Sequence, residues 1–172
     1  ESFMPVTKLN EGSSFVLRFE NENPKDVNNG VYNYYQFGKL SEKERLMISY
    51  MTGPLRSTAF NHIRTRKQMG YIVSVGIENE SKIYGMKIMA QGSFASTHAM
   101  EREVEASLIL FHTYLKDELD QASIDDFISS FKAKRKVEDF TYQSTLEWIK
   151  FEPDYIENIV EFSKAELIEF FE

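Results

Sequence analysis

The sequence predicts an α+β domain, with one antiparallel or mixed sheet and helices packed on one face of it. Several short stretches alternate apolar and polar residues, which is the period of a strand. Other stretches repeat apolar residues every three or four positions, which is the period of a helix. In chain order these stretches give two strands, two helices, two more strands and then helices only.

Composition indicates a folded globular chain. It has 172 residues, of which 42% are hydrophobic and 14% aromatic, and these numbers suit one domain with a substantial core. We expect residues 1–12 to form an arm or linker and residues 13–172 a single domain. No apolar run approaches the ~20 residues of a membrane span. There is no cysteine, which excludes disulfides and thiolate zinc sites and is compatible with a reducing compartment such as the cytoplasm.

Charge is unevenly distributed. The net charge of −7 argues against a general nucleic-acid binder. Between Glu44 and Glu78 there is no acidic residue, and this stretch holds five cations: Arg45, Arg56, Arg64, Arg66 and Lys67. A local basic patch in an acidic chain suggests a local anionic or carbonyl-rich partner. The competing interpretation, which we favour for Arg56 and Lys67, is a solvated helix face.

The first part of the chain predicts two strands. In residues 13–20, Phe15, Leu17 and Phe19 alternate with more polar positions, so one face of this strand should lie on the core. A turn-rich loop follows. Residues 31–37 are rich in tyrosine and predict a second strand, buried on both faces.

Two helices are expected next. Ser41 and Glu44 form a capping-box pattern, which predicts a helix from there to about Met51. Gly53-Pro54 should interrupt it, and Pro54 suits the first position of the following helix.

The second of these helices leads into the most informative stretch of the chain. Its apolar stripe is Leu55, Ala59 and Ile63. Gly70 suits the left-handed conformation that ends a helix. A strand then begins in which Tyr71 shares one face with Val73 and Val75. The pattern therefore predicts that Arg64 and Tyr71 meet at one helix–strand corner.

The rest of the chain predicts a hairpin followed by helices. Strands at 71–78 and 82–91 are joined at 79–81, and the apolar face of the second strand is Tyr84, Met86, Ile88 and Ala90. Ser96 caps a long helix whose core stripe is Met100, Val104, Leu108, Phe111 and Leu115. Further helices are expected at 124–137, 145–151 and 153–162, and a capping box of Ser163 and Glu166 opens a last one that ends at Phe171.

One motif resembles a known family. The run Arg64-Thr65-Arg66-Lys67-Gln68-Met69-Gly70-Tyr71-Ile72-Val73 is similar to a signature in the last domain of insulinase/pitrilysin zinc metallopeptidases. About ten positions agree in order, and weaker similarity extends from the 31–36 strand to the 165–171 helix. The resemblance implies the metallopeptidase-repeat fold of that family, a LuxS/MPP-like domain.

The same resemblance implies a role in peptide hydrolysis. This chain would be the C-terminal domain of a larger zinc metalloendopeptidase, with zinc and the general base on an N-terminal half of the same polypeptide. It would bind peptide substrates, and neither nucleic acid nor membrane. Arg64 would bind the substrate, and the Tyr71 hydroxyl would stabilise the oxyanion of the transition state. By itself this fragment should be inactive.

A zinc site within this chain is not expected. Its histidines are His62, His98 and His112. The nearest approach to the family's His-x-x-Glu-His is His98-Ala99-Met100-Glu101-Arg102, where an arginine, which cannot ligate zinc, replaces the second histidine. There is also no Gly-x-Ser-x-Gly elbow for a serine hydrolase.

Two alternatives stay open at this point. Arg64 could pair with a glutamate while Tyr71 fills the core, so that the corner is only structural. The domain could also be a catalytically inactive peptide-binding or scaffolding module of the same fold. The family domain would close with another strand after the last helix, and this sequence stops at Glu172. We therefore expect the sheet to lack its final strand, and an open edge of that kind would favour homo-oligomers.

Overall fold

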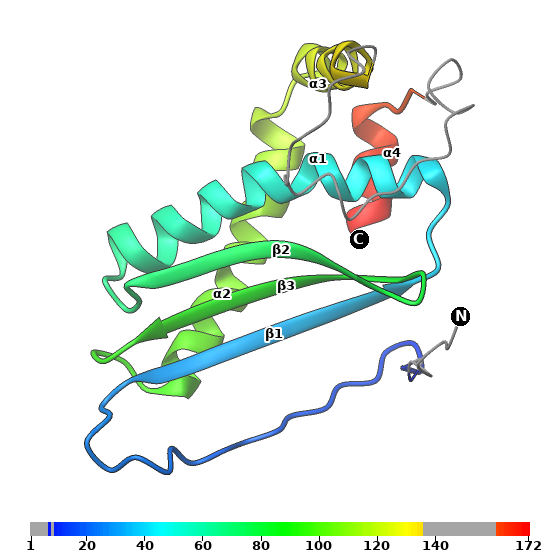
Figure 1. Cartoon of the computed structure of the whole chain (residues 1–172). Coiled ribbons are helices and arrows are strands. Elements are labelled where there is room, and N and C mark those ends of the chain that lie inside the picture. Colours follow the sequence, from blue (N-terminus) through cyan, green and yellow to red (C-terminus); the bar gives the residue numbers. More distant parts are fainter. Residues whose placement is uncertain (1–6, 8, 136–160) are drawn as a thin grey trace.

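A computed structural model gives the fold of residues 7, 9–135 and 161–172. Its centre is an antiparallel sheet in the order β1-β3-β2, formed by Asn29–Gly38, Ile83–Gly92 and Ile72–Glu80 respectively. Helices cover one face of this sheet (Figure 1). The α+β class is therefore confirmed, with strands that pair antiparallel throughout the described residues.

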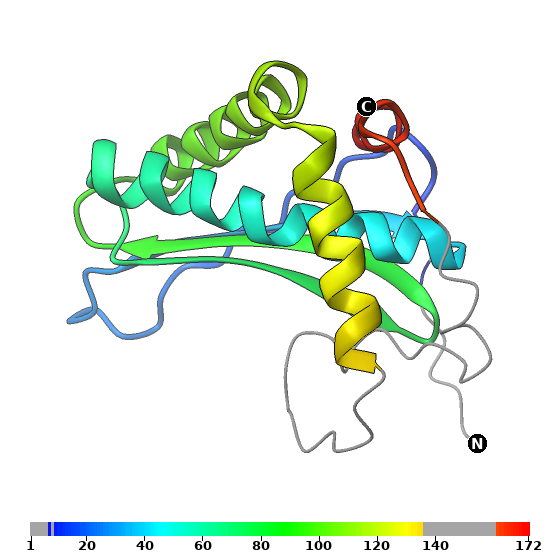
Figure 2. The same ribbon diagram turned by 90° about the horizontal axis from the view of Figure 1, so that it is seen from above.

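The helical layer is a series of packed segments. Helix α1 spans Glu42–Ala59 and continues without a break into a π-helix, η1, at Phe60–Arg66. Helix α2, Thr97–Thr113, similarly continues into η2, Tyr114–Glu118, and is followed by α3, Gln121–Arg135, and α4, Lys164–Phe171. Figure 2 shows α1 lying along the sheet with the other helices beside and above it.

The core lies between the sheet and these helices. The stripe expected on β3 is buried, since Tyr84, Met86, Ile88 and Ala90 are at most 5% exposed. The stripe of α2 faces it, with Met100, Val104, Phe111 and Leu115 inaccessible to solvent and Leu108 partly buried. Burying one such side chain contributes about 1.5–3 kcal/mol.

The helix starts agree with the sequence. The Ser41 hydroxyl accepts from the Glu44 amide at 3.3 Å, and the Glu44 carboxylate accepts from the Ser41 amide. A second capping box joins Ser163 and Glu166, and Ser96 caps α2. Each of these caps satisfies backbone N–H groups that the first helical turn leaves free.

The strand expected at residues 13–20 is absent. That segment has no regular secondary structure, and Phe15, Leu17 and Phe19 are 73–87% exposed. An alternating pattern forms a strand only when a neighbouring strand satisfies its backbone, and this segment pairs with none of the described strands. Whether residues 1–12 act as a separate arm stays a prediction.

Strand β1 lies at an edge of the sheet. The expectation that it is buried on both faces was wrong. Tyr32 is 53% exposed, and most of the strand is only half-buried. The helices cover one face only, which leaves the alternate residues of β1 towards solvent (Figure 1).

The expected break at Gly53-Pro54 does not occur, because α1 runs through it. The Thr52 hydroxyl donates to the Ile48 carbonyl at 2.7 Å, and the Thr58 hydroxyl donates to the Pro54 carbonyl at 3.0 Å. Leu55, directly after the proline, is fully buried. Tertiary packing therefore outweighs the cost of proline inside a helix.

The hairpin between β2 and β3 turns one residue later than expected. Its two turn residues are Ser81 and Lys82, with φ of 51° and 68°. Two consecutive positive φ values are typical of the type I′ turn that joins two-residue hairpins.

Some expectations fall on residues that the structure does not describe. The helix at 145–151 lies there, as do residues 153–160 of the one expected at 153–162 and the last residues of the one expected at 124–137; residues 161 and 162 are described and are not helical. Among the described residues, no helix is both long enough and apolar enough to cross a membrane.

Candidate functional site

The candidate site begins on the π-helix η1, which the sequence analysis did not predict. The Lys67 amide donates to the His62 carbonyl at 3.0 Å, a bond between residues five apart. Such a turn is wider than an α-helical turn, and short π-helices often occur at functional sites. Ile63 is fully buried and anchors η1 on the core, while its neighbour Arg64 is exposed.

Arg64 lies at the surface over an aromatic ring. Its guanidinium carbon is 5.0 Å from the ring centroid of Phe60, one turn earlier in the same helix. This cation–π contact orients the side chain, and the guanidinium N–H groups donate to no other described residue. No carboxylate in the described part of the chain forms an ion pair with Arg64. The alternative in which Arg64 pairs with a glutamate is therefore not observed there.

The connection from η1 to β2 differs from the expectation at Gly70. The left-handed residue is Gln68, with φ of 55°, and Gly70 is not in that region. Gly70 is tightly packed, since a Cβ there would lie 3.3 Å from the Gln91 and Ile72 carbonyl oxygens, and the packing requires glycine at position 92. A Cβ on Gly92 would lie 2.5 Å from the Met69 carbonyl oxygen and 3.0 Å from the Gly70 Cα. The two glycines let the connection cross directly over the end of β3.

This close approach places Tyr71 just before β2. Its amide donates to the Gln91 carbonyl at 2.9 Å, which fixes the backbone against β3. The side chain is 47% exposed, so it is not a core tyrosine. Its hydroxyl donates to Asn28 Oδ1 at 3.3 Å, and Asn28 lies in the loop before β1.

Arg64 and Tyr71 therefore lie on the two sides of one short connection, as predicted. Neither hydrogen bonds to the other among the described contacts. Both present donors to solvent: a guanidinium fork and a phenolic hydroxyl whose present acceptor is a surface amide. These groups suit the carbonyl oxygens of a peptide backbone.

A polar cluster behind η1 was also missed. Glu103 of α2 is 8% exposed, and its Oε2 atom lies 2.8 Å from His62 Nε2 and 3.3 Å from Lys67 Nζ. Burial by itself raises the pKa of the Glu103 carboxyl, but hydrogen bonds and charge from His62 and Lys67 outweigh it and lower the pKa. Since the partners lie about forty residues apart, no local pattern could have indicated them.

The two cations that we assigned to a solvated face are exposed, and each also bonds to another element of the domain. Arg56 donates to the Val75 carbonyl from Nε and Nη2, at 3.2 and 3.0 Å, and ties α1 to β2. Lys67 pairs with Glu103.

The described residues do not fit a zinc site. No three histidine, aspartate or glutamate side chains among them lie together in a metal-binding arrangement. His62 bonds to Glu103, and His112 bonds to Glu172 at 3.0 Å. His98 is exposed at the start of α2.

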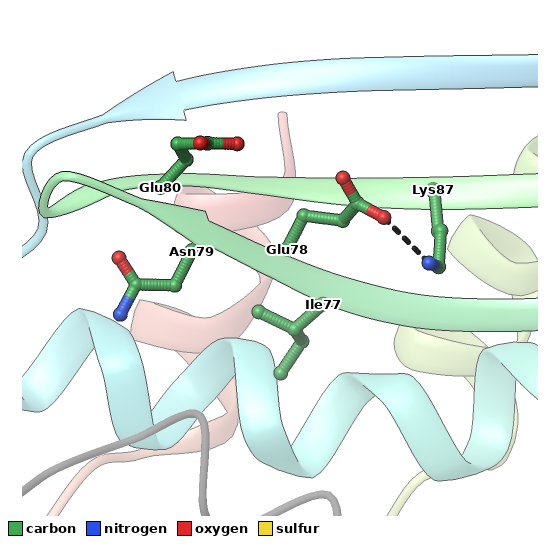
Figure 3. A pocket seen from close by; sticks show the side chains of 5 residues that line it. All are labelled: Ile77, Glu78, Asn79, Glu80 and Lys87. Carbon is green, nitrogen blue, oxygen red and sulfur yellow. Dashed lines mark hydrogen bonds and ion pairs between the residues drawn. The ribbon is translucent and has the colours of Figure 1, made fainter. Parts of the chain in front are cut away.

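A pocket lies away from the Arg64–Tyr71 corner. It measures about 220 Å³ and is lined by residues 77–80 of β2 and Lys87 of β3. Figure 3 shows the Lys87 ammonium directed at the Glu78 carboxylate, an ion pair that closes part of the pocket floor. Because it adjoins the hairpin turn at the opposite end of β2 from Tyr71, it does not extend the candidate site.

A known protein family matches the part of the chain that contains Arg64 and Tyr71. Residues 51–148 match the family described as "PQQ synthase PqqF-like, C-terminal lobe domain 4". The match covers more than half of the chain and includes both Arg64 and Tyr71. The chain belongs to the insulinase/pitrilysin family.

Curated relatives agree with this family. The chain is 27% identical over 128 residues to the peroxisomal insulin-degrading enzyme-like 1 of Arabidopsis thaliana, which covers 74% of the chain. It is 30% identical over 104 residues to the insulin-degrading enzyme of Homo sapiens, which covers 60% of it. The chain spans only 13% and 10% of the lengths of these relatives.

The fold agrees as well. A crystal structure of pitrilysin superposes with a TM-score of 0.61 over 86% of this chain and 17% of that one, at 12% sequence identity. The chain is thus one domain-sized part of an insulinase-family architecture. That family consists of zinc metallopeptidases, and the described residues here contain no group that could hold the metal.

Proposed function

We propose that this chain is the part of an insulinase-family zinc metalloendopeptidase that binds the peptide and stabilises the transition state without binding the metal. Zinc and the general base would come from an N-terminal half of the same polypeptide. The observation that carries the proposal is the exposure of Arg64 and Tyr71 on either side of one rigid connection. In the described part of the chain, the Arg64 guanidinium lies over the Phe60 ring and the Tyr71 hydroxyl donates to Asn28, and neither contact would prevent substrate from binding.

Tyr71 would act on the reacting carbonyl. When a peptide bond is attacked, its carbonyl oxygen gains negative charge in the tetrahedral intermediate. A phenolic O–H aimed at that oxygen donates a stronger hydrogen bond to the oxyanion than to the neutral carbonyl. The bond to Asn28, at 3.3 Å, is exposed to solvent and would be exchanged for the substrate at little cost.

Arg64 would hold the substrate before and during reaction. A guanidinium offers five N–H donors in a fixed plane, which suits one or two backbone carbonyls. Stacking on Phe60 restricts the side chain, so less conformational entropy is lost when substrate binds. Together these two residues would orient a peptide across the corner.

The test is the Tyr71→Phe variant of the full-length polypeptide, assayed on short peptides. The proposal requires a large loss of kcat with intact fold and metal content. A full-length protein that hydrolyses no peptide but still binds one would instead indicate the scaffolding function.

A further inference from the structure

A single buried carboxylate contacts both ends of the segment that carries Arg64. Glu103 Oε2 lies 2.8 Å from His62 Nε2, two residues before Arg64, and 3.3 Å from Lys67 Nζ, three residues after it. The side chains of His62 and Glu103 are only 11% and 10% exposed. The contact therefore joins α2 to η1 and to the residue that directly follows η1.

Such a contact matters because a π-helix is a poor structure without support. π-Helices are rare and occur mostly as single turns inside α-helices, so we expect a π-helix of this length to depend on contacts with the rest of the fold. Within η1 only Ile63 is fully buried, so apolar packing fixes a single point of the segment. The remaining support that the structure provides is polar, and it converges on Glu103.

Charge makes this support strong. A carboxylate at 8% exposure is costly unless it is paired and hydrogen-bonded, and Glu103 has both kinds of partner. The pKa of Glu103 is lowered despite its burial, because His62 and Lys67 together outweigh the desolvation. Removing the charge would release two side chains of the segment at once.

We propose that Glu103 is a positioning residue, which acts through His62 and Lys67 to hold η1 in the conformation that presents Arg64 to substrate. This inference rests on the proposed function of Arg64. A positioning role differs from a merely structural role, because Glu103 would then affect substrate affinity through the Arg64 side chain.

The test is a double-mutant cycle in the full-length polypeptide, with KM and kcat measured on a short peptide. Glu103→Gln keeps the size of the side chain and removes its charge. We expect a rise in KM of about three- to tenfold with a smaller change in kcat. In the Arg64→Ala background the same change should leave KM where Arg64→Ala alone puts it, because the residue that Glu103 positions is gone.

Two further variants keep the test decisive. Lys67→Met removes one exposed partner and should raise KM in the same direction but less, even if Glu103→Gln folds poorly. Glu105→Gln is the matched control: it lies on the same helix and accepts from the Tyr35 hydroxyl at 2.8 Å, but it contacts β1 and not η1. Its KM should equal that of the wild type.

The outcomes separate the two proposals. If Arg64→Ala raises KM but Glu103→Gln and Lys67→Met do not, the positioning role is wrong and the proposed function stands. The same holds if Glu103→Gln raises KM equally with and without Arg64. If Arg64→Ala itself leaves KM unchanged, the proposed function of Arg64 is wrong, and the inference fails with it.

Discussion

The Tyr71 hydroxyl lies 3.3 Å from the Oδ1 atom of Asn28, a side-chain amide in the loop before β1. Both residues are on the surface, and Tyr71 is 47% exposed. The hydroxyl of a tyrosine that is buried for packing would form a hydrogen bond with a fixed internal partner. The Tyr71 hydroxyl instead donates to a surface side chain, which a ligand could replace as the acceptor.

The first prediction is that Tyr71→Phe lowers kcat of the full-length peptidase by about 10²–10³. The change removes one O–H and almost no volume, and only the transition state makes full use of that donor. KM should change little, because the neutral carbonyl is a poorer acceptor. The control is Tyr32→Phe, which removes the hydroxyl of a second half-exposed tyrosine, one that lies on β1. Near wild-type kcat for Tyr71→Phe would make the tyrosine structural.

The second prediction concerns Arg64→Ala, which should raise KM by about ten- to hundredfold, since it removes charged hydrogen bonds that exist before the reaction. Arg66→Ala is the matched control, because Arg66 is an exposed arginine on the same π-helix. Steady-state kinetics with both variants at equal melting temperature separates lost binding from lost fold. Equal KM values for the two would argue against a specific role of Arg64.

Third, the isolated domain should bind no zinc stoichiometrically. Two of its histidines already bond to carboxylates of the domain, and His98 is exposed. Metal analysis of purified, tag-free protein checks this. One tightly bound zinc per chain that disappears in His98→Ala would contradict it.

Fourth, the contact between α1 and α4 should depend on pH. Lys43 bonds to Glu166, and this bond, followed by the Ser163 amide and hydroxyl, lowers the pKa of Glu166 from 4.5 to about 2. A depressed carboxyl pKa stabilises the fold above the unfolded value and loses that contribution as pH falls through the folded value. The melting-temperature difference between wild type and Glu166→Gln should therefore be largest above about pH 5 and vanish near pH 2.

Glu169→Gln gives the control for that experiment. It neutralises another carboxylate of α4, one that has no ion pair in the described part of the domain. A difference for Glu166→Gln that persists unchanged down to pH 2 would mean that the charge of Glu166 contributes nothing.

Fifth, the isolated domain should self-associate. Among the described strands, β1 pairs on one side only, so a row of its backbone groups is available to another chain. Light scattering over a range of concentrations measures this. A strictly monomeric species at high concentration would show that the edge is protected.

The features that sequence predicted well are those determined by neighbours in the chain. Capping boxes at Ser41 and Ser163 need two residues three apart. The buried face of β3 needs only a period of two, and the stripe of α2 a period of three to four. The Arg64–Tyr71 corner belongs to this class, because six residues and one glycine-containing connection separate its members.

What sequence missed depends on residues far apart. Glu103 contacts His62 and Lys67 from another helix, and Gly70, in the connection before β2, packs against Gly92 of β3. For the same reason the alternation at 13–20 was misleading, because a strand needs a partner that no local pattern can specify. Pro54 was misjudged because packing of Leu55 overrode local propensity.

The turn at Ser81 and Lys82 has a practical consequence for protein engineering. Both residues hold positive φ, a conformation that costs a side-chain-bearing residue about 1 kcal/mol and that asparagine and glycine adopt readily. Replacing the pair by Asn-Gly would raise the melting temperature of the domain. The substitution lies at the opposite end of β2 from Tyr71, so it would leave the candidate site unchanged. Such a background would give soluble, folded protein for site variants that are too unstable to assay in the natural sequence.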